Sequence, residues 1–253
     1  MKIDTIVIPR RFCGPPNSAN GGYACGRLGA FIEGSAEVTL RRPPPLEKAL
    51  AVSREDDGTV ALHDGDNLIA RARPAEIAVP ADRSPSFEQA VAASGRTFDS
   101  SFHKLPMCFV CGPDREPGDG LRIFCGPLDP ADTEWSGTVA APWIPEPFAA
   151  GDDNAVRAEF VWAALDCPTA FAAGSPAGFP TILLGRQTVR LVRRPDVGEK
   201  CVVTARLTGR EGRKYLAEAM LFGADGAAIA ACKAVWIEVE RTVQLGRGRP
   251  AGT

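Results

Sequence analysis

A single carboxylate inside an apolar stretch is the first group in this 253-residue chain that could do chemistry. Asp166 follows Ala164 and Leu165, and the apolar residues around it recur with helical spacing. Burying an unpaired carboxylate is costly, so Asp166 should have either a partner or a role. It could activate water as a base or act as a nucleophile. The alternative is local, because Cys167-Pro168 could start a new helical turn that Asp166 caps.

A second candidate is the start of a predicted helix at Asn20-Gly21-Gly22. Free N–H groups at the positive end of a helix attract anions, and glycines let a ligand approach them closely. Asn20 is a good N-cap residue, and its amide could also polarise a carbonyl group. Close packing of the helix on its sheet is the alternative explanation for its glycines, which include Gly26 and Gly29.

Cysteine and histidine usage limits the metal chemistry of the chain, which has eight cysteines and two histidines. Cys108-x-x-Cys111, with Cys125 further on, has the spacing of two zinc ligands. A closed structural site needs four ligands, and no second pair of this kind lies nearby. We therefore expect ordinary reduced cysteines, neither a zinc site nor a redox pair, and no cofactor.

A repeated segment divides the chain into two halves. Residues 41–48 and 193–200 both begin Arg-Arg-Pro and end Glu-Lys. Their arginines could bind phosphate groups, because guanidinium and phosphate pair through two parallel hydrogen bonds. Solubility at a strand end is the alternative explanation.

The same order of elements is predicted around each copy of this segment. A helix precedes it, at 20–33 in the first half and at 154–173 in the second. The expected strands cover 37–40, 49–53, 59–63 and 67–73 in the first half and 187–192, 201–207, 214–222 and 227–240 in the second. The last two strands of each half flank an Asp-Gly turn, which is a strong hairpin signal.

This order predicts an α+β fold of the double hotdog type, in which a helix wrapped by an antiparallel sheet occurs twice. Another α+β pairing of the same elements stays open. The predicted units are residues 1–80, a linker at 81–106 with a short helix near 85–93, residues 107–241, and a flexible tail at 242–253.

Several short motifs resemble double-hotdog acyl-CoA thioesterases of the type II class. Residues 20–26, Asn-Gly-Gly-Tyr-Ala-Cys-Gly, are similar to the Gly-Gly-x-x-x-Gly helix start of that family, and Arg42-Pro43 to an Arg-Pro that ends a strand soon afterwards. The stretch around Asp166 resembles the second-half helix that carries the family's catalytic Asp. Residues 108–112, with Gly120-Leu121 beyond them, resemble the start of a hotdog unit in other thioesterase-like proteins.

The resemblance implies hydrolysis of an acyl-CoA, or of a similar acyl thioester, without a metal ion. Asp166 would activate water, and the backbone of Gly21 and Gly22 would hold the developing oxyanion. Asn20 could help to polarise the carbonyl, and the acyl chain would lie between the two helices. The residues expected to bind substrate or orient water are Gly21, Gly22, Tyr23, Thr208, Arg193 and Arg194.

Two departures from the family pattern keep a non-catalytic acyl-CoA-binding protein as the alternative. Pro168 interrupts helical hydrogen bonding just after Asp166. The Gln of the family's last strand has no counterpart at 232–236, and Gln244 lies too far along the chain. A hotdog hydratase is disfavoured, because its Asp-x-x-x-x-His pair would need His where Phe171 stands.

Composition excludes other classes of protein. A net charge of −2 disfavours nucleic acid as a partner. No apolar run approaches the roughly 20 residues of a membrane span. The first ten residues lack the apolar core of a signal peptide, so we expect a cytoplasmic protein, which could form homo-oligomers.

Overall fold

The structure is a computed structural model that describes residues 1–81, 83–178 and 180–239. The expected tail at 242–253 and Gln244 therefore lie outside the described residues. First-half strands are β1 (Lys2–Ile6), β2 (Ala36–Leu40), β3 (Leu50–Arg54), β4 (Val60–Asp64) and β5 (Asn67–Pro74). Second-half strands are β6 (Gly126–Pro127), β7 (Thr138–Trp143), β8 (Ile182–Leu191), β9 (Cys201–Glu211), β10 (Lys214–Phe222) and β11 (Ala228–Glu238). All eight predicted strands are observed, although β8 begins at Ile182 instead of residue 187 and β9 extends to Glu211. The strands β1, β6 and β7 have no counterpart among the predicted ranges.

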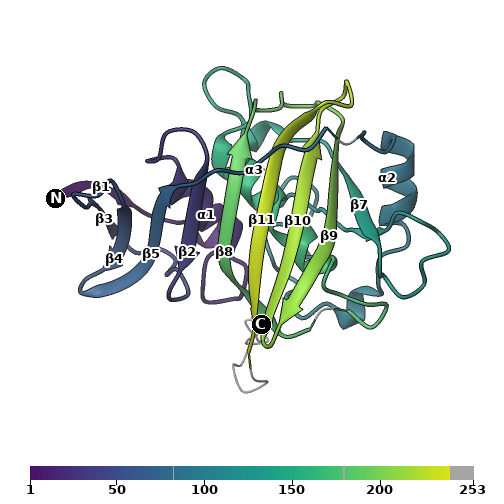
Figure 1. Cartoon of the computed structure of the whole chain (residues 1–253), viewed down its shortest axis with the longest axis horizontal. Helices are drawn as coiled ribbons and strands as arrows, with labels where there is room; N and C mark the ends of the chain where they lie inside the picture. Colours follow the sequence, from purple (N-terminus) through teal and green to yellow (C-terminus); the bar gives the residue numbers. More distant parts are fainter. Residues whose placement is uncertain (82, 179, 240–253) are drawn as a thin grey trace, which may run out of the picture.

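All of these strands form one antiparallel sheet, in the order β1-β3-β4-β5-β2-β8-β11-β10-β9-β7-β6. Figure 1 shows the strands side by side, with the first half on the left and the second half on the right. The halves meet where β2 pairs with β8, with Ala36 opposite Val189 and Thr39 opposite Arg186. Read outward from this pair, the first five strands of each half follow in the same relative order, and β6 is an additional edge strand of the second half.

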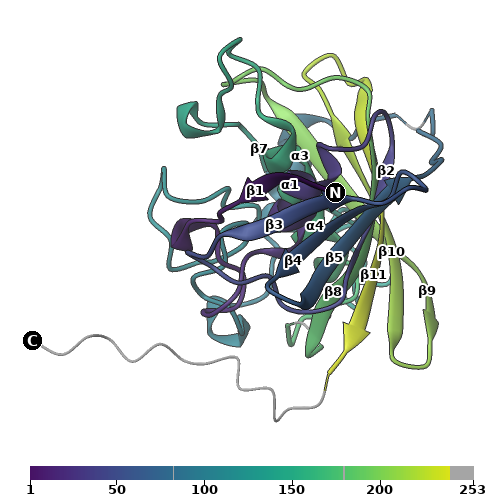
Figure 2. The same cartoon turned by 90° about the vertical axis from the view of Figure 1, so that its left-hand side faces the viewer.

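The helices are α1 (Gly21–Gly29), α2 (Phe87–Ser94), α3 (Ala158–Ala164) and α4 (Asp166–Phe171). Figure 2 shows α1, α3 and α4 together on one side of the curved sheet. The largest buried cluster joins residues of these three helices to the strands. None of the described helices is both long and apolar enough to cross a membrane.

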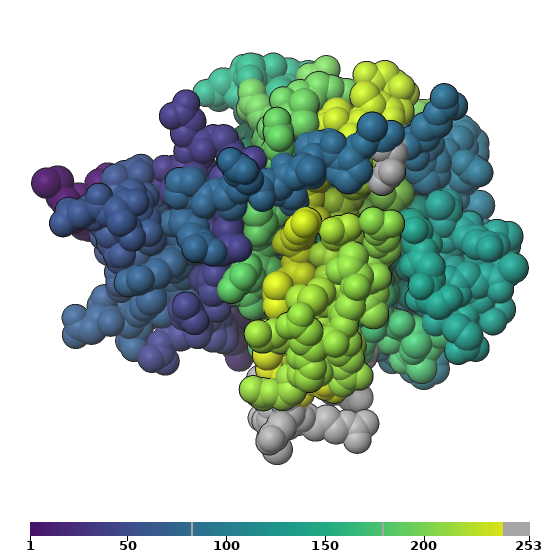
Figure 3. Space-filling model, viewed as in Figure 1, coloured from purple at the N-terminus to yellow at the C-terminus, as the bar shows by residue number. Residues whose placement is uncertain are grey.

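The predicted linker at 81–106 contains the predicted short helix, observed as α2. Its first turn carries a capping box formed by Ser86 and Gln89. Ala90 and Ala93 are fully buried against second-half residues that include Phe222. Figures 1 and 3 show the chain between β5 and α2 crossing the sheet to reach this position.

The predicted helix at 154–173 is wrong in two respects. Asn154 has a φ of 63° and lies in a turn, so the helix begins only at Ala158. The helix is also interrupted at Leu165, and α4 starts at Asp166. Pro168 explains the interruption, because it has no N–H and its ring would clash with the carbonyl of Ala164 in a continuous helix.

The glycines of α1 allow it to touch α3 directly. A Cβ atom on Gly26 would lie 2.6 Å from Cα of Glu159, and one on Gly29 would lie 2.8 Å from the Trp162 ring. Close packing is therefore the reason for these glycines, with a helix rather than the sheet as the partner. The expected place for an acyl chain, between the two helices, does not agree with this contact.

Gly26→Ala tests the contact, because it should reverse the usual effect of the substitution. In an ordinary helix interior alanine is about 1 kcal/mol more favourable than glycine. Here the added methyl group meets backbone, so we expect destabilisation of about 1–3 kcal/mol. Urea unfolding measures the change, and Gly209→Ala on β9, where a Cβ atom has room, is the control. Stabilisation by Gly26→Ala would contradict the packing.

Candidate functional site

Asp166 connects the two segments that sequence analysis selected. Its Oδ2 accepts a hydrogen bond of 2.9 Å from Nδ2 of Asn20 and one of 3.0 Å from the N–H of Gly22. Asn20 is also the N-cap of α1, since its Oδ1 accepts a hydrogen bond from the N–H of Tyr23. Asp166 does not cap α4 through its side chain. The carboxylate therefore joins the start of α4 to the start of α1.

This carboxylate is almost completely buried, with a relative exposure of 1%. Burial raises the pKa of Asp166 to about 7, although the Gly22 N–H and the Asn20 amide act to lower it. Its other oxygen, Oδ1, makes no hydrogen bond with any group in the described part of the chain. Asp166 thus offers one anchored oxygen and one oxygen that can still accept a proton or a hydrogen bond.

A pocket of about 420 Å³ borders this carboxylate. The volume lies in the usual range for small-molecule sites. Polar and thiol groups, apolar side chains and basic side chains each line part of it. These residues include Asn20, Gly21, Cys108, Cys111, Asp166 and Cys167, then Leu40, Ile182, Leu184 and Trp236, and finally Arg41, Arg42 and Lys104.

Three cysteines meet beside Asp166, although sequence analysis connected only two of them. Cys108, Cys111 and Cys167 are buried, and their Sγ atoms all lie within 4.8 Å of one another. Side-chain hydrogen bonds from Cys111 and Cys167 lower the pKa of Cys108 well below its ordinary value. The same contacts with Cys108 raise the pKa of its two partners. The adjacency of Cys167 to Asp166 was the only signal for its place here.

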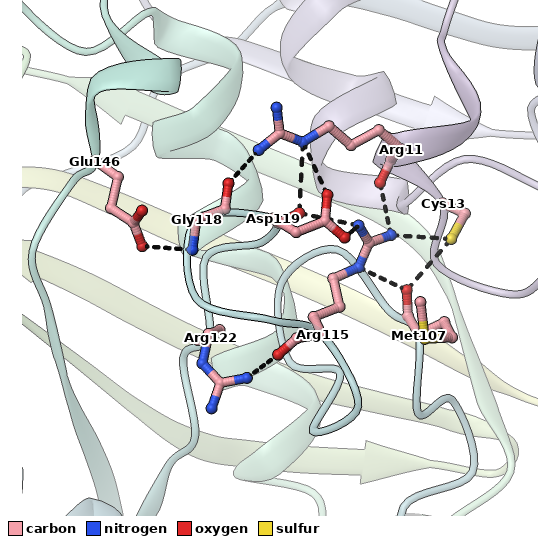
Figure 4. A network of polar contacts seen from close by, with 8 residues as sticks. All are labelled: Arg11, Cys13, Met107, Arg115, Gly118, Asp119, Arg122 and Glu146. Atoms are coloured by element: carbon pink, nitrogen blue, oxygen red, sulfur yellow. Dashed lines mark hydrogen bonds and ion pairs between the residues drawn. The ribbon is translucent and has the colours of Figure 1, made fainter.

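The segment that carries Cys108 and Cys111 is held by a buried arginine (Figure 4). Arg115 donates to the carbonyl groups of Met107 and Arg11, and it pairs with Asp119 at 2.9 Å. These contacts tie the segment to the chain just before α1. The cysteines therefore keep a fixed position relative to Asn20.

Several predicted site residues lie elsewhere. Tyr23 is buried and stacks on Phe12, with ring centroids 4.2 Å apart. Thr208 is exposed on β9, where its hydroxyl donates to the carbonyl of Leu216. Neither Tyr23 nor Thr208 is among the residues that line the pocket.

The two arginine pairs of the repeat have different surroundings. Arg193 forms a double hydrogen bond with Glu199, and Arg194 pairs with Asp153. Both lie outside the pocket lining, whereas the equivalent Arg41 and Arg42 belong to it. The first-half pair is thus the one that could meet a ligand in this pocket.

The backbone N–H of Gly22 does not have its expected role, and one buried side-chain amide was not selected from the sequence. The N–H of Gly22 is engaged by Asp166, so it supports the carboxylate and is not a free donor for an oxyanion. Gln187 on β8 was not selected from the sequence. It is fully buried, and its Nε2 donates to the carbonyl of Trp162 at 2.9 Å, which fixes the end of α3.

Comparisons with known proteins identify the fold. No family model and no curated protein sequence match this chain. A solved hotdog protein of unknown function from Alicyclobacillus acidocaldarius is similar to it, with a TM-score of 0.57 and 10% identity, covering 94% of this chain and 93% of that one. This chain has a hotdog fold.

Two further solved structures are similar to this chain. A tesB protein of Mycobacterium avium subspecies paratuberculosis has a TM-score of 0.59 and 17% identity, covering 93% of this chain and 92% of that one. A candidate thioesterase II of Thermobifida fusca has a TM-score of 0.60 and 14% identity, covering 94% and 93%. At these identities the likeness establishes the fold.

The ion pair of Arg193 predicts a pH-dependent stability. Arg193, helped by the N–H groups of Ala224 and Asp196, lowers the pKa of Glu199 to about 2. The carboxylate therefore stabilises the fold above its unfolded pKa of about 4.3, and this contribution is lost as pH falls toward 2. Glu199→Gln should lower stability at pH 7 by about 1–3 kcal/mol.

Unfolding in denaturant between pH 7 and pH 3 measures this contribution. The difference between wild type and Glu199→Gln should shrink as the pH falls. Exposed Glu211→Gln is the control and should show little difference at any pH. A constant difference for Glu199→Gln would mean that its charge is not the cause.

Proposed function

We propose that this protein is a double-hotdog thioesterase that hydrolyses an acyl-CoA or a similar acyl thioester. The tandem arrangement is supported by the strand order, which for the first five strands is the same outward from β2 and from β8. The repeated segments 41–48 and 193–200 support it too, since each connects equivalent strands, β2 to β3 and β8 to β9. The likeness to solved thioesterase structures is compatible with thioester hydrolysis, but it is not the evidence for this proposal.

The observation that carries the proposal is the position of Asp166. One of its oxygens is anchored by α1, the other is unpartnered among described residues, and the residue borders an apolar pocket. Oδ1 would take a proton from a water molecule whose oxygen attacks the thioester carbonyl carbon. The carbon–sulfur bond then breaks, the thiolate leaves and accepts a proton, and a carboxylic acid remains.

Gly21 is the candidate for stabilising the oxyanion that forms during this attack. It is the first residue of α1 and lines the pocket. The N–H of a first helical residue has no partner within its own helix. A backbone donor directed at the developing charge typically contributes more to the transition state than to the bound substrate.

The rest of the pocket fits the two ends of an acyl-CoA. Leu40, Ile182 and Leu184 offer an apolar surface for the acyl group. Arg41 and Arg42 are exposed at the same pocket and can pair with phosphate oxygens. The proposal therefore assigns phosphate binding to this first-half pair.

Asp166→Asn separates an enzyme from a binding protein. The amide keeps the shape of the carboxylate but cannot act as a base, so thiol release from acyl-CoA should fall by about 10²–10⁴-fold. Affinity for the substrate should change little, because the amide oxygen can still accept the hydrogen bonds of Asn20 and Gly22. Initial rates with a panel of acyl-CoAs measure the first effect, and calorimetry measures the second.

Asp66→Asn, in the exposed turn between β4 and β5, is the control and should keep full activity. Full activity in Asp166→Asn would remove this residue from the reaction. A wild-type protein that binds acyl-CoA but releases no thiol would favour the non-catalytic alternative.

The repeat supplies a matched test of the phosphate site. Arg41→Ala combined with Arg42→Ala should weaken coenzyme A binding by about 10-fold or more, since a hydrogen bond to a charged group contributes about 1.5–3 kcal/mol. The remaining affinity should also depend less on salt. Arg193→Ala with Arg194→Ala is the control, expected to bind normally when folded. The opposite ranking of the two pairs, measured by calorimetry, would move the site to the second half.

A further inference from the structure

Cys108, Cys111 and Cys167, named here the cysteine triad, form a compact group that the proposed hydrolysis does not use. Sγ of Cys108 lies 3.7 Å from Sγ of Cys167, and all three sulfur atoms lie within 4.8 Å of one another. Zinc–thiolate bonds of about 2.3 Å place two sulfur atoms about 3.8 Å apart at a tetrahedral ion. Cys108 and Cys167 already have this spacing. The sulfur atom of Cys111 lies within 4.8 Å of both, so small side-chain rotations would bring it to the same spacing.

The backbone around Cys108 and Cys111 keeps their side chains together. The N–H of Gly112 donates to the carbonyl of Cys108 at 2.8 Å, which closes a tight turn. A Cβ atom at Gly112 would lie 2.5 Å from the carbonyl oxygen of Pro106, so only glycine fits there. Cys167 is supplied by the first turn of α4, and Nδ2 of Asn20 lies 3.9 Å from Sγ of Cys108 and 3.8 Å from Sγ of Cys167.

The group has room for a fourth ligand from the pocket. All three cysteines line the pocket. The carboxylate of Asp166 does not belong to this group of ligand atoms, so it does not complete the set in this arrangement. Zinc sites with three protein ligands typically leave the fourth position to water.

The ligand type and the net charge of the site indicate which metal ion the three thiols would bind. Thiolates favour zinc, copper(I) and iron–sulfur clusters, and clusters normally need four cysteines. Three thiolates give a net charge of −1 with Zn²⁺ and −2 with Cu⁺. The smaller buried charge costs less desolvation free energy.

We propose that the cysteine triad binds one zinc ion, with a water molecule from the pocket as its fourth ligand. The site does not depend on the proposed hydrolysis, because its evidence is the arrangement of the thiols.

Zinc titration of the full-length protein tests the proposal. The protein is reduced, freed of metal with a chelator, and titrated with Zn²⁺ against a chromophoric competitor. We expect one ion per chain. Cys108→Ser and Cys167→Ser should each weaken binding by more than the roughly 10–100-fold cost of losing a residue that only supports a ligand. Cys201→Ser, at a buried cysteine outside the triad, should bind zinc normally.

X-ray absorption of the zinc-loaded wild type gives a second measurement that needs no variant. We expect three sulfur atoms at about 2.3 Å and one oxygen or nitrogen atom. No stoichiometric binding by the reduced protein, only oxygen and nitrogen neighbours, or unchanged binding in Cys167→Ser would each overturn the site. Neither measurement contains a thioester, so hydrolysis and zinc binding can fail separately.

Discussion

The close approach of α1 to α3 and α4 is the constraint on which the site depends. A Cβ atom at Gly22 would lie 2.4 Å from Cβ of Asp166, so no larger residue permits this contact. Only at this distance can the Gly22 N–H and the Asn20 amide both reach the carboxylate. A buried carboxylate without these donors would carry the full cost of desolvation. The glycines therefore determine both the packing of the helices and the hydrogen bonds that the Asp166 carboxylate receives.

The pairing of β2 with β8 places the residues of the pocket beside Asp166. The strands are antiparallel, so the end of β2 lies next to the start of β8. Arg41 and Arg42 follow β2 directly, while Ile182 and Leu184 belong to the start of β8. The junction between the halves thus brings basic and apolar side chains to one pocket.

The sequence predicted the strands well, because alternation and Asp-Gly turns are local signals. It also selected Asp166 and Asn20, but no local signal could reveal that residues 146 positions apart share a hydrogen bond. The arginine pairs show the same limit. Glu199 binds Arg193, whereas its repeat equivalent Glu47 binds the N–H of Arg10. Equivalent residues of the repeat therefore have different partners, which only the tertiary structure distinguishes.

Pro168 interrupts the helix, as its sequence position suggested, and it also belongs to the start of the next helix. It lies in the first turn of α4, where the missing N–H leaves no helical hydrogen bond unmade. The Asp166 carbonyl accepts a hydrogen bond of 2.6 Å from the Thr169 hydroxyl, which in turn accepts one of 2.8 Å from the Trp236 indole. The main chain of Asp166 is thus tied to β11 while its side chain is tied to α1. A group held from both sides keeps its orientation without reorganisation, which is the property that the proposed hydrolysis requires of Asp166.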